Sequence, residues 1–212
     1  MIFDASEAIQ LLVLAACFAL ALVKALRMRN SAWIEVACFF ACMLLGNVYY
    51  FGYTLVFGDS PHYSYIADLG WIAGYIFLLM LMVECDQGRG ITSPAPVAWI
   101  PVAACAACCA YYIAVNGYPM LNVADNGLMA ALGFFAVRGL VASPKDGTSK
   151  SFANNRALHV AVLAFVVVEQ ALWLSSLISK PGLGFDAYTT INYALTLSYV
   201  TVLACAWRSD EL

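Results

Sequence analysis

Seven stretches of almost unbroken apolar residues follow one another along the 212-residue chain, separated by short polar segments. They cover residues 8–26, 32–57, 65–84, 95–115, 120–142, 157–178 and 187–207. At a rise of 1.5 Å per residue, about 20 helical residues cross the roughly 30 Å hydrocarbon core of a bilayer. A soluble helix of this length would show a charged outer face, and these stretches show none. The pattern therefore predicts an all-α integral membrane bundle of seven transmembrane helices.

The composition leaves no room for a separate soluble domain. Hydrophobic residues make up 64% of the chain and charged residues 11%, against about a quarter charged in soluble domains. The polar connections are too short to fold alone, so we expect residues 1–212 to form a single transmembrane domain. The basic residues are scattered at helix ends, which argues against nucleic-acid binding and leaves the lipid bilayer as the expected partner.

The basic residues also predict how the chain is oriented. Nine of the ten Lys and Arg residues lie at the ends of the odd-numbered stretches or just after them, and only Lys180 lies on the opposite side. Because cytoplasmic segments of membrane proteins are rich in Lys and Arg, we expect the N-terminus outside and the C-terminus in the cytoplasm. No basic residue precedes the first stretch, so we expect it to stay as a span rather than be cleaved as a signal peptide. This topology is compatible with a three-plus-one-plus-three arrangement, in which two three-helix halves are related by an axis along the membrane normal.

Eight cysteines raise the question of disulfides or a metal site. Seven of them lie within predicted spans: Cys17, Cys38, Cys42, Cys105, Cys108, Cys109 and Cys205. Thiolate metal sites need supporting polar groups, and the alanine-rich residues around Cys105–Cys109 supply none. We therefore interpret these cysteines as small packing residues and expect neither a metal nor a cofactor.

Polar residues inside the spans carry the remaining information about function. Glu169 lies near the middle of the sixth stretch, where insertion scales place the cost of an acid at about 2.5–3.5 kcal/mol. A period of 3.6 places polar and aromatic residues of the other stretches on single faces, which pack most cheaply when turned inward. The ligand-binding residues predicted in this way are Glu169, Trp173, Asp68, Trp71, Tyr75, Asn192, Asn47 and Asp125.

Nearly all of these residues fall in the outer half of the predicted bundle. We expect a cavity open to the outside, with aromatic walls, the three acids Asp68, Asp125 and Glu169, and no basic residue. Such a site suits a small organic cation or a polar molecule with an amine. The alternative for Asp68 and Asp125 is that they only mark helix starts in headgroup water.

Other functions compete with small-molecule recognition. Glu169 could serve as the protonatable site of a small proton-coupled transporter, or the chain could be a non-catalytic membrane subunit of a larger complex. The sequence contains no H-E-x-x-H, G-x-S-x-G or Walker motif, and no lysine in its last span for retinal, so we expect no enzyme. An intramembrane enzyme that pairs Glu169 with His159 or Asp125 ranks last, since His159 is about 15 Å away along the same helix.

Residues 58–71, which read GDSPHYSYIADLGW, lead into an aromatic and leucine-rich stretch. This segment resembles parts of the multi-span membrane input regions of bacterial sensor kinases and diguanylate cyclases, where an Asp at the outer start of a span precedes such turns. The resemblance implies a ligand-sensing seven-helix domain in a bacterial plasma membrane. No kinase or cyclase segment follows Trp207, so it also implies signalling through a separate cytoplasmic protein. The polar residues 143–155 are either a plain connector or the docking segment for that partner.

Overall fold

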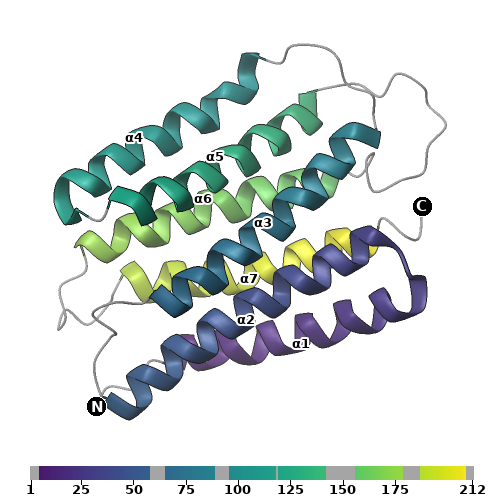
Figure 1. Ribbon diagram of the computed structural model, residues 1–212, viewed down its shortest axis with the longest axis horizontal. Helices are drawn as coiled ribbons and strands as arrows, with labels where there is room; N and C mark the ends of the chain where they lie inside the picture. Colours follow the sequence, from purple (N-terminus) through teal and green to yellow (C-terminus); the bar gives the residue numbers. More distant parts are fainter. Residues whose placement is uncertain are drawn as a thin grey trace.

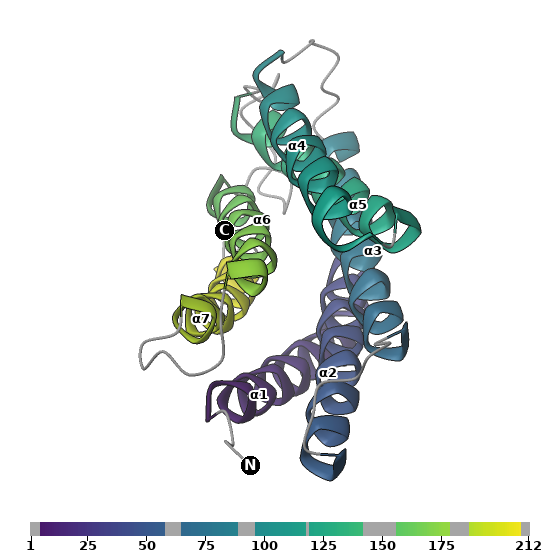
Figure 2. The same cartoon turned by 90° about the vertical axis from the view of Figure 1, so that its left-hand side faces the viewer.

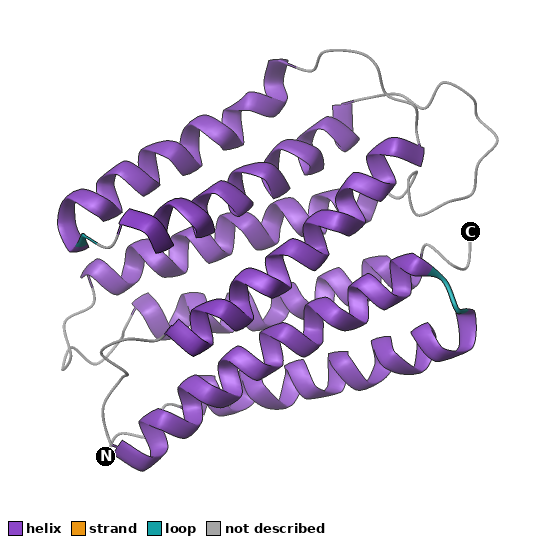
Figure 3. Ribbon diagram, viewed as in Figure 1, coloured by secondary structure: helices purple, strands orange, loops and turns teal. Residues whose placement is uncertain are grey.

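The computed structural model describes residues 5–57, 65–88, 96–117, 119–141, 156–178 and 187–208, and these ranges contain helices and no strand (Figures 1 and 3). The elements are α1 (Ala5–Met28), α2 (Ser31–Phe57), α3 (Tyr65–Gly88), the 3-10 turn η1 (Pro96–Ala98), α4 (Trp99–Asn116), α5 (Pro119–Val141), α6 (Arg156–Ile178) and α7 (Ala187–Arg208). All seven α-helices are long and apolar enough to cross a bilayer, which confirms the predicted seven-helix bundle. The helix ends differ from the predicted spans by a few residues, because polar residues in the first and last turns do not show in a hydrophobic pattern.

A tight corner between α1 and α2 sets these helices antiparallel. Arg29 adopts a left-handed backbone with φ of 50°, and its N–H donates to the carbonyl oxygen of Ala25 at 3.0 Å. The side-chain oxygen of Asn30 accepts from the N–H of Ala32 at 3.0 Å. The corner therefore closes the last turn of α1 and caps the first turn of α2 with two residues.

Six of the seven helices form a closed ring. Around it, the neighbouring pairs are α1 with α2, α2 with α3, α3 with α5, α5 with α6, α6 with α7, and α7 with α1. Helix α4 packs outside the ring against α5 and α6 (Figure 2). The ring thus consists of two sequential triplets, α1–α3 and α5–α7, an order compatible with a three-plus-one-plus-three arrangement.

Glycines allow α2 and α3 to approach closely. A Cβ atom placed on Gly70 would lie 2.9 Å from both the Cα and the N of Gly46, and 3.1 Å from the carbonyl oxygen of Cys42. These contacts are backbone atoms, which cannot move aside as a flexible side chain could. Small residues at a helix crossing bring backbones together in this way within membranes.

Five aromatic rings fill the middle of the ring of helices, and we call them the aromatic core. Its members are Phe39 and Phe40 of α2, Tyr75 of α3, Phe165 of α6 and Tyr199 of α7, and all are fully buried or nearly so. Phe165 contacts three of the other rings, with centroids 5.8 Å from Phe39, 5.7 Å from Tyr199 and 6.1 Å from Tyr75. These spacings are those of favourable edge and tilted aromatic contacts, so the core holds four helices together.

We refer to the end of the bundle at which α1, α3, α5 and α7 begin as the outer end, and to the opposite one as the inner end. Every Lys and Arg in the described ranges lies at or near the inner end: Lys24, Arg27, Arg29, Arg138, Arg156 and Arg208. Two of them join helices there, since Arg138 of α5 forms an ion pair with Asp86 of α3 at 3.2 Å and the Lys24 ammonium lies 4.2 Å from the Trp207 ring. Residues 143–155, the predicted docking segment, lie outside the described ranges.

We expect Gly70→Ala to lower the stability of the bundle by about 1–3 kcal/mol, the usual cost of forcing extra atoms into a close-packed interior. Thermal unfolding in mild detergent measures the effect. Gly127→Ala is the matched control, because a Cβ on that α5 glycine has no neighbour within 4 Å. Equal stability of the two variants would contradict the close α2–α3 contact.

The distribution of Lys and Arg predicts a cytoplasmic inner end. A fluorescent protein that matures only in the cytoplasm, fused after residue 212, should therefore fluoresce in a bacterial host, and alkaline phosphatase fused at the same point should be inactive. The reverse pair of results would invert the orientation and place the outer end in the cytoplasm.

Candidate ligand-binding cavity

A cavity of about 430 Å³ opens in the outer half of the bundle, and all seven helices contribute to its lining. Its lining residues are Glu7, Gln10, Met43, Asn47, Tyr50, Asp68, Trp71, Tyr112, Leu121, Asn122, Asp125, Glu169, Leu172, Trp173, Ser176, Tyr188, Asn192, Leu195 and Tyr199. Tyr199 belongs to the aromatic core, so the core lies on the inner side of the cavity. The cavity is therefore deepest where the bundle is most densely packed with aromatic rings.

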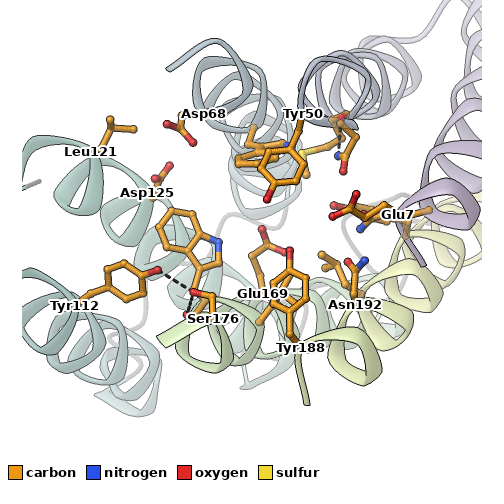
Figure 4. A pocket seen from close by; sticks show the side chains of 18 of the residues that line it. Glu7, Tyr50, Asp68, Tyr112, Leu121, Asp125, Glu169, Ser176, Tyr188 and Asn192 are labelled. Atoms are coloured by element: carbon orange, nitrogen blue, oxygen red, sulfur yellow. Dashed lines mark hydrogen bonds between the residues drawn. The ribbon is translucent and has the colours of Figure 1, made fainter. Parts of the chain in front are cut away.

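Among the described residues, the lining carries four carboxyl groups and no Lys, Arg or His. Three of the acids, Asp68, Asp125 and Glu169, are those that the sequence predicts. The fourth is Glu7, in the first turn of α1. Figure 4 shows Asp68 and Asp125 on one side of the cavity, Glu169 near its middle, and Glu7 with Asn192 on the other side.

A tyrosine on the inner side of the cavity forms a hydrogen bond with Glu169. The carboxyl group is 5% exposed, and its Oε1 accepts a hydrogen bond from the hydroxyl of Tyr75. The side chain of Trp173, one turn further along α6, lines the cavity beside the carboxyl group. The second oxygen, Oε2, is buried without a hydrogen-bond partner among the described residues. Glu169 therefore presents an acceptor atom whose bonding capacity is unused.

Tyr75 occupies a different position from the one expected. The sequence places it among the lining residues, whereas the structure buries it completely and leaves it outside the lining. Its ring is part of the aromatic core and only its hydroxyl reaches Glu169. Helix periodicity gives the face that Tyr75 shares with Asp68 and Trp71, but not the depth at which that face meets the neighbouring helices.

Asp125 resembles Glu169 in its surroundings. It is 3% exposed, and its Oδ2 is buried without a hydrogen-bond partner in the described part of the chain. Asp68 and Glu169 both lie within electrostatic range of it. This burial argues against a helix start in headgroup water for Asp125, whereas Asp68, half-buried in the first turn of α3, fits both interpretations.

Asparagine side chains form hydrogen bonds in the first turns of α5, the helix that carries Asp125. The amide of Asn122 donates to the carbonyl oxygen of Gly117 at 2.8 Å, and the amide of Asn126 donates to the carbonyl oxygen of Asn122 at 2.9 Å. Gly117 itself has a positive φ of 77°, which a glycine adopts at no steric cost. The turn between α4 and α5 is thus tied to the helix that carries Asp125.

Aromatic side chains form much of the cavity wall. Tyr50 and Trp71 have ring centroids 6.1 Å apart, and Tyr112 and Trp173 have centroids 5.6 Å apart. The Tyr112 and Ser176 hydroxyls are 3.1 Å apart, which ties peripheral α4 to α6 (Figure 4). Indole and phenol rings of this kind attract cations through their faces.

The two predicted asparagines both line the cavity, with part of their hydrogen bonding already used. Asn192 donates to the hydroxyl of Ser6 at 3.0 Å and so joins α7 to α1. Asn47 donates to the carbonyl oxygen of Met43 on its own helix at 2.8 Å. Their amide oxygens add acceptors to a lining that already carries four carboxyl groups.

Sequence reasoning missed Glu7, Gln10 and Tyr112 as lining residues. Glu7 belongs to the acidic N-terminal residues, a pattern typical of a chain end exposed to water. Tyr112 has the pattern of the tyrosines that lie at the lipid–water interface of many membrane proteins. Gln10 lies one turn after Ser6 and Glu7 on α1, so an inward polar face of α1 was the available signal.

No cluster of three or more His, Cys, Asp or Glu within the described ranges could hold a metal ion. His159 lies near the inner end of α6, where its ring packs directly against Gly139 of α5. It is outside the cavity lining, so the acid–base pair of His159 and Glu169 is not assembled at the cavity.

We expect Tyr75→Phe to lower stability by about 1.5–3 kcal/mol, the cost of removing a hydrogen bond to a charged group. In a Glu169→Leu background the same change should cost nothing, because the hydroxyl has lost its acceptor. Thermal unfolding of the four proteins in detergent gives the coupling between the two residues. Tyr199→Phe is the control in the same aromatic core, and an equal cost for both tyrosines would refute a specific role for Tyr75.

No protein-family model, curated protein or solved structure matches this chain. What can be inferred about its function comes from the chemistry of the cavity itself.

Proposed function

We propose that this multi-span membrane protein recognises a small organic cation from the outside and acts as a sensor. The observation that carries the proposal is a cavity of about 430 Å³ whose lining, in the described part of the chain, has four carboxyl groups and no Lys, Arg or His. The volume falls within the range of about 300–1,000 Å³ that small-molecule sites occupy. The bacterial plasma membrane, which the sequence resemblance suggests, is part of the same proposal.

Two buried carboxyl groups, those of Glu169 and Asp125, give the physical reason why a cation should bind in the cavity. An ionised carboxyl group removed from water is unfavourable by several kcal/mol unless an opposite charge and hydrogen bonds compensate for it. Within the described lining, Glu169 and Asp125 each keep one buried oxygen without a partner. A bound ammonium group would supply both the charge and the missing donor, while the aromatic walls would contact its alkyl part.

The aromatic core favours recognition over passage. Five buried rings fill the bundle directly inward of the cavity, so a ligand bound at Glu169 meets a packed interior rather than an open path. A sensor needs only to pass a change of helix packing to the inner end, where a cytoplasmic partner could respond. Residues 143–155 are our candidate for that docking segment.

A small proton-coupled transporter is the second candidate. Glu169 favours it, because this acid contacts the aromatic core through Tyr75 and faces the cavity with its other oxygen. Counterflow of a bound cation in proteoliposomes separates the two functions, since a sensor gives none. A non-catalytic subunit of a larger complex would instead co-purify with a stoichiometric second protein in mild detergent.

The first test is a thermal-shift screen of purified protein against organic cations, amines and neutral analogues. A cation at one hundred times its dissociation constant should stabilise the wild type by about 2.7 kcal/mol. Glu169→Gln should weaken this cation by at least about tenfold, because one charge partner is lost while the shape is kept.

Glu35→Gln is the matched control for this screen. Glu35 is also an acid within a candidate span, but it lies near the inner end of α2 and outside the cavity lining. It should leave the affinity for the cation unchanged. If no cation stabilises the wild type, or if both variants lose the same affinity, the proposed cation site is refuted.

A further inference from the structure

The four acids of the cavity fall into two groups, and this division bears on the kind of cation that fits. Asp68 of α3 and Asp125 of α5 form the first group, which we call the aspartate pole. Glu169 of α6, near the middle of the cavity, and Glu7 of α1, on its other side, form the second, which we call the glutamate pole (Figure 4). Helices α3 and α5 pack against each other on one side of the ring, whereas α1 and α6 both pack against α7 on the other. The aspartate pole therefore lies to one side of Glu169, and Glu7 lies to the other (Figure 4).

Each pole contains one buried carboxyl oxygen that has no donor within the described part of the chain. The unused oxygens are Oδ2 of Asp125 at the aspartate pole and Oε2 of Glu169 at the glutamate pole, both without a partner in the described ranges. Both side chains are more than nine-tenths buried and both line the cavity. Each of these oxygens can therefore accept a charge-assisted hydrogen bond from an ammonium group.

The depths of the two acids favour an elongated ligand. At 1.5 Å per residue, Asp125 lies about 9 Å from the start of α5, and Glu169 lies about 14 Å from the end of α6. Glu169 is therefore the deeper acid. A ligand that reaches both must run obliquely into the cavity from the aspartate pole to the glutamate pole.

The surface between the poles suits a short alkyl chain. Tyr50 and Trp71 lie on the α2–α3 side and Trp173 on the α6 side, with Leu172 and Leu195 at lining positions beside them. Rings and leucine side chains gain free energy by covering methylene groups, which they cannot gain from a compact hydrated ion. No group of acids in the described chain has the arrangement that a metal ion requires.

We propose that the cavity selects an aliphatic diamine, with one ammonium group at Asp125 and Asp68 and the other at Glu169 and Glu7. This inference rests on the proposed cation site and adds the ligand's second charge. The diamine would place a donor on each unused carboxyl oxygen and bring one positive charge to each pole.

The test measures the affinities of wild-type protein for aminobutane, for diaminobutane and for diamines with shorter and longer chains. We expect diaminobutane or a close neighbour to bind at least about tenfold more tightly than aminobutane, because the second ammonium adds a charge-assisted hydrogen bond. We also expect affinity to pass through a maximum along the series, since only one length spans the two poles. This series needs no variant and so does not depend on the folding of a mutant.

Single substitutions then test which ammonium group each pole binds. Asp125→Asn should lower the affinity for the diamine by about tenfold and reduce its advantage over the monoamine, while Glu169→Gln weakens both ligands. Glu84→Gln, an exposed acid near the inner end of α3, is the control and should change neither affinity.

The outcomes separate this inference from the proposed function. If monoamines and diamines bind equally well, or if calcium ions displace every diamine, the diamine inference is overturned. Equal binding of the two amine classes would still leave a cation site in place. If no amine binds at all, the proposed function fails together with the inference.

Discussion

The hydrocarbon interior of a bilayer offers no hydrogen-bond partners, and this lack decides where the polar side chains of the protein can lie. Hydroxyl groups find an acceptor in the backbone of their own helix. Thr196 donates to the carbonyl oxygen of Asn192 at 2.9 Å, and Ser198 donates to that of Leu195 at 2.6 Å. An ionised carboxyl group cannot do this, because it only accepts and the helix carbonyls only accept as well. The acids within the outer half therefore share one cavity, where donors from other helices, or from a ligand, can reach them.

The same requirement explains the division of the bundle into a packed middle and a hollow outer half. The aromatic core uses large rings to fill the centre of the helix ring, and Tyr75 turns one polar atom of that core toward Glu169. Above it, the lining residues come from helix faces on which polar and aromatic side chains alternate with leucine. Such faces leave space that neither lipid nor a dry core can fill.

Hydrophobic length and charge bias were enough to predict seven spans, because the bilayer imposes a fixed thickness on every one of them. The buried acid Glu169 was equally visible, since its cost in mid-span is large. Tyr75 lies deeper than its place in the sequence pattern indicates, because periodicity gives direction but not depth. The outlying place of α4 was also hidden, because an apolar helix looks the same in sequence whether lipid or protein covers it.

Helix α4 joins the two triplets along the chain and yet lies outside their ring. The triplets thus meet each other inside the ring along two seams, α3 against α5 and α7 against α1. A hinge between two such rigid halves would leave the packing within each half unchanged and would need sliding only at these seams. Asp68 and Asp125 stand on either side of the first seam, and Ser6 and Asn192 are hydrogen-bonded across the second. A cation bound by the two aspartates would therefore link the triplets at the α3–α5 seam, just as the Ser6–Asn192 hydrogen bond already links them at the α7–α1 seam.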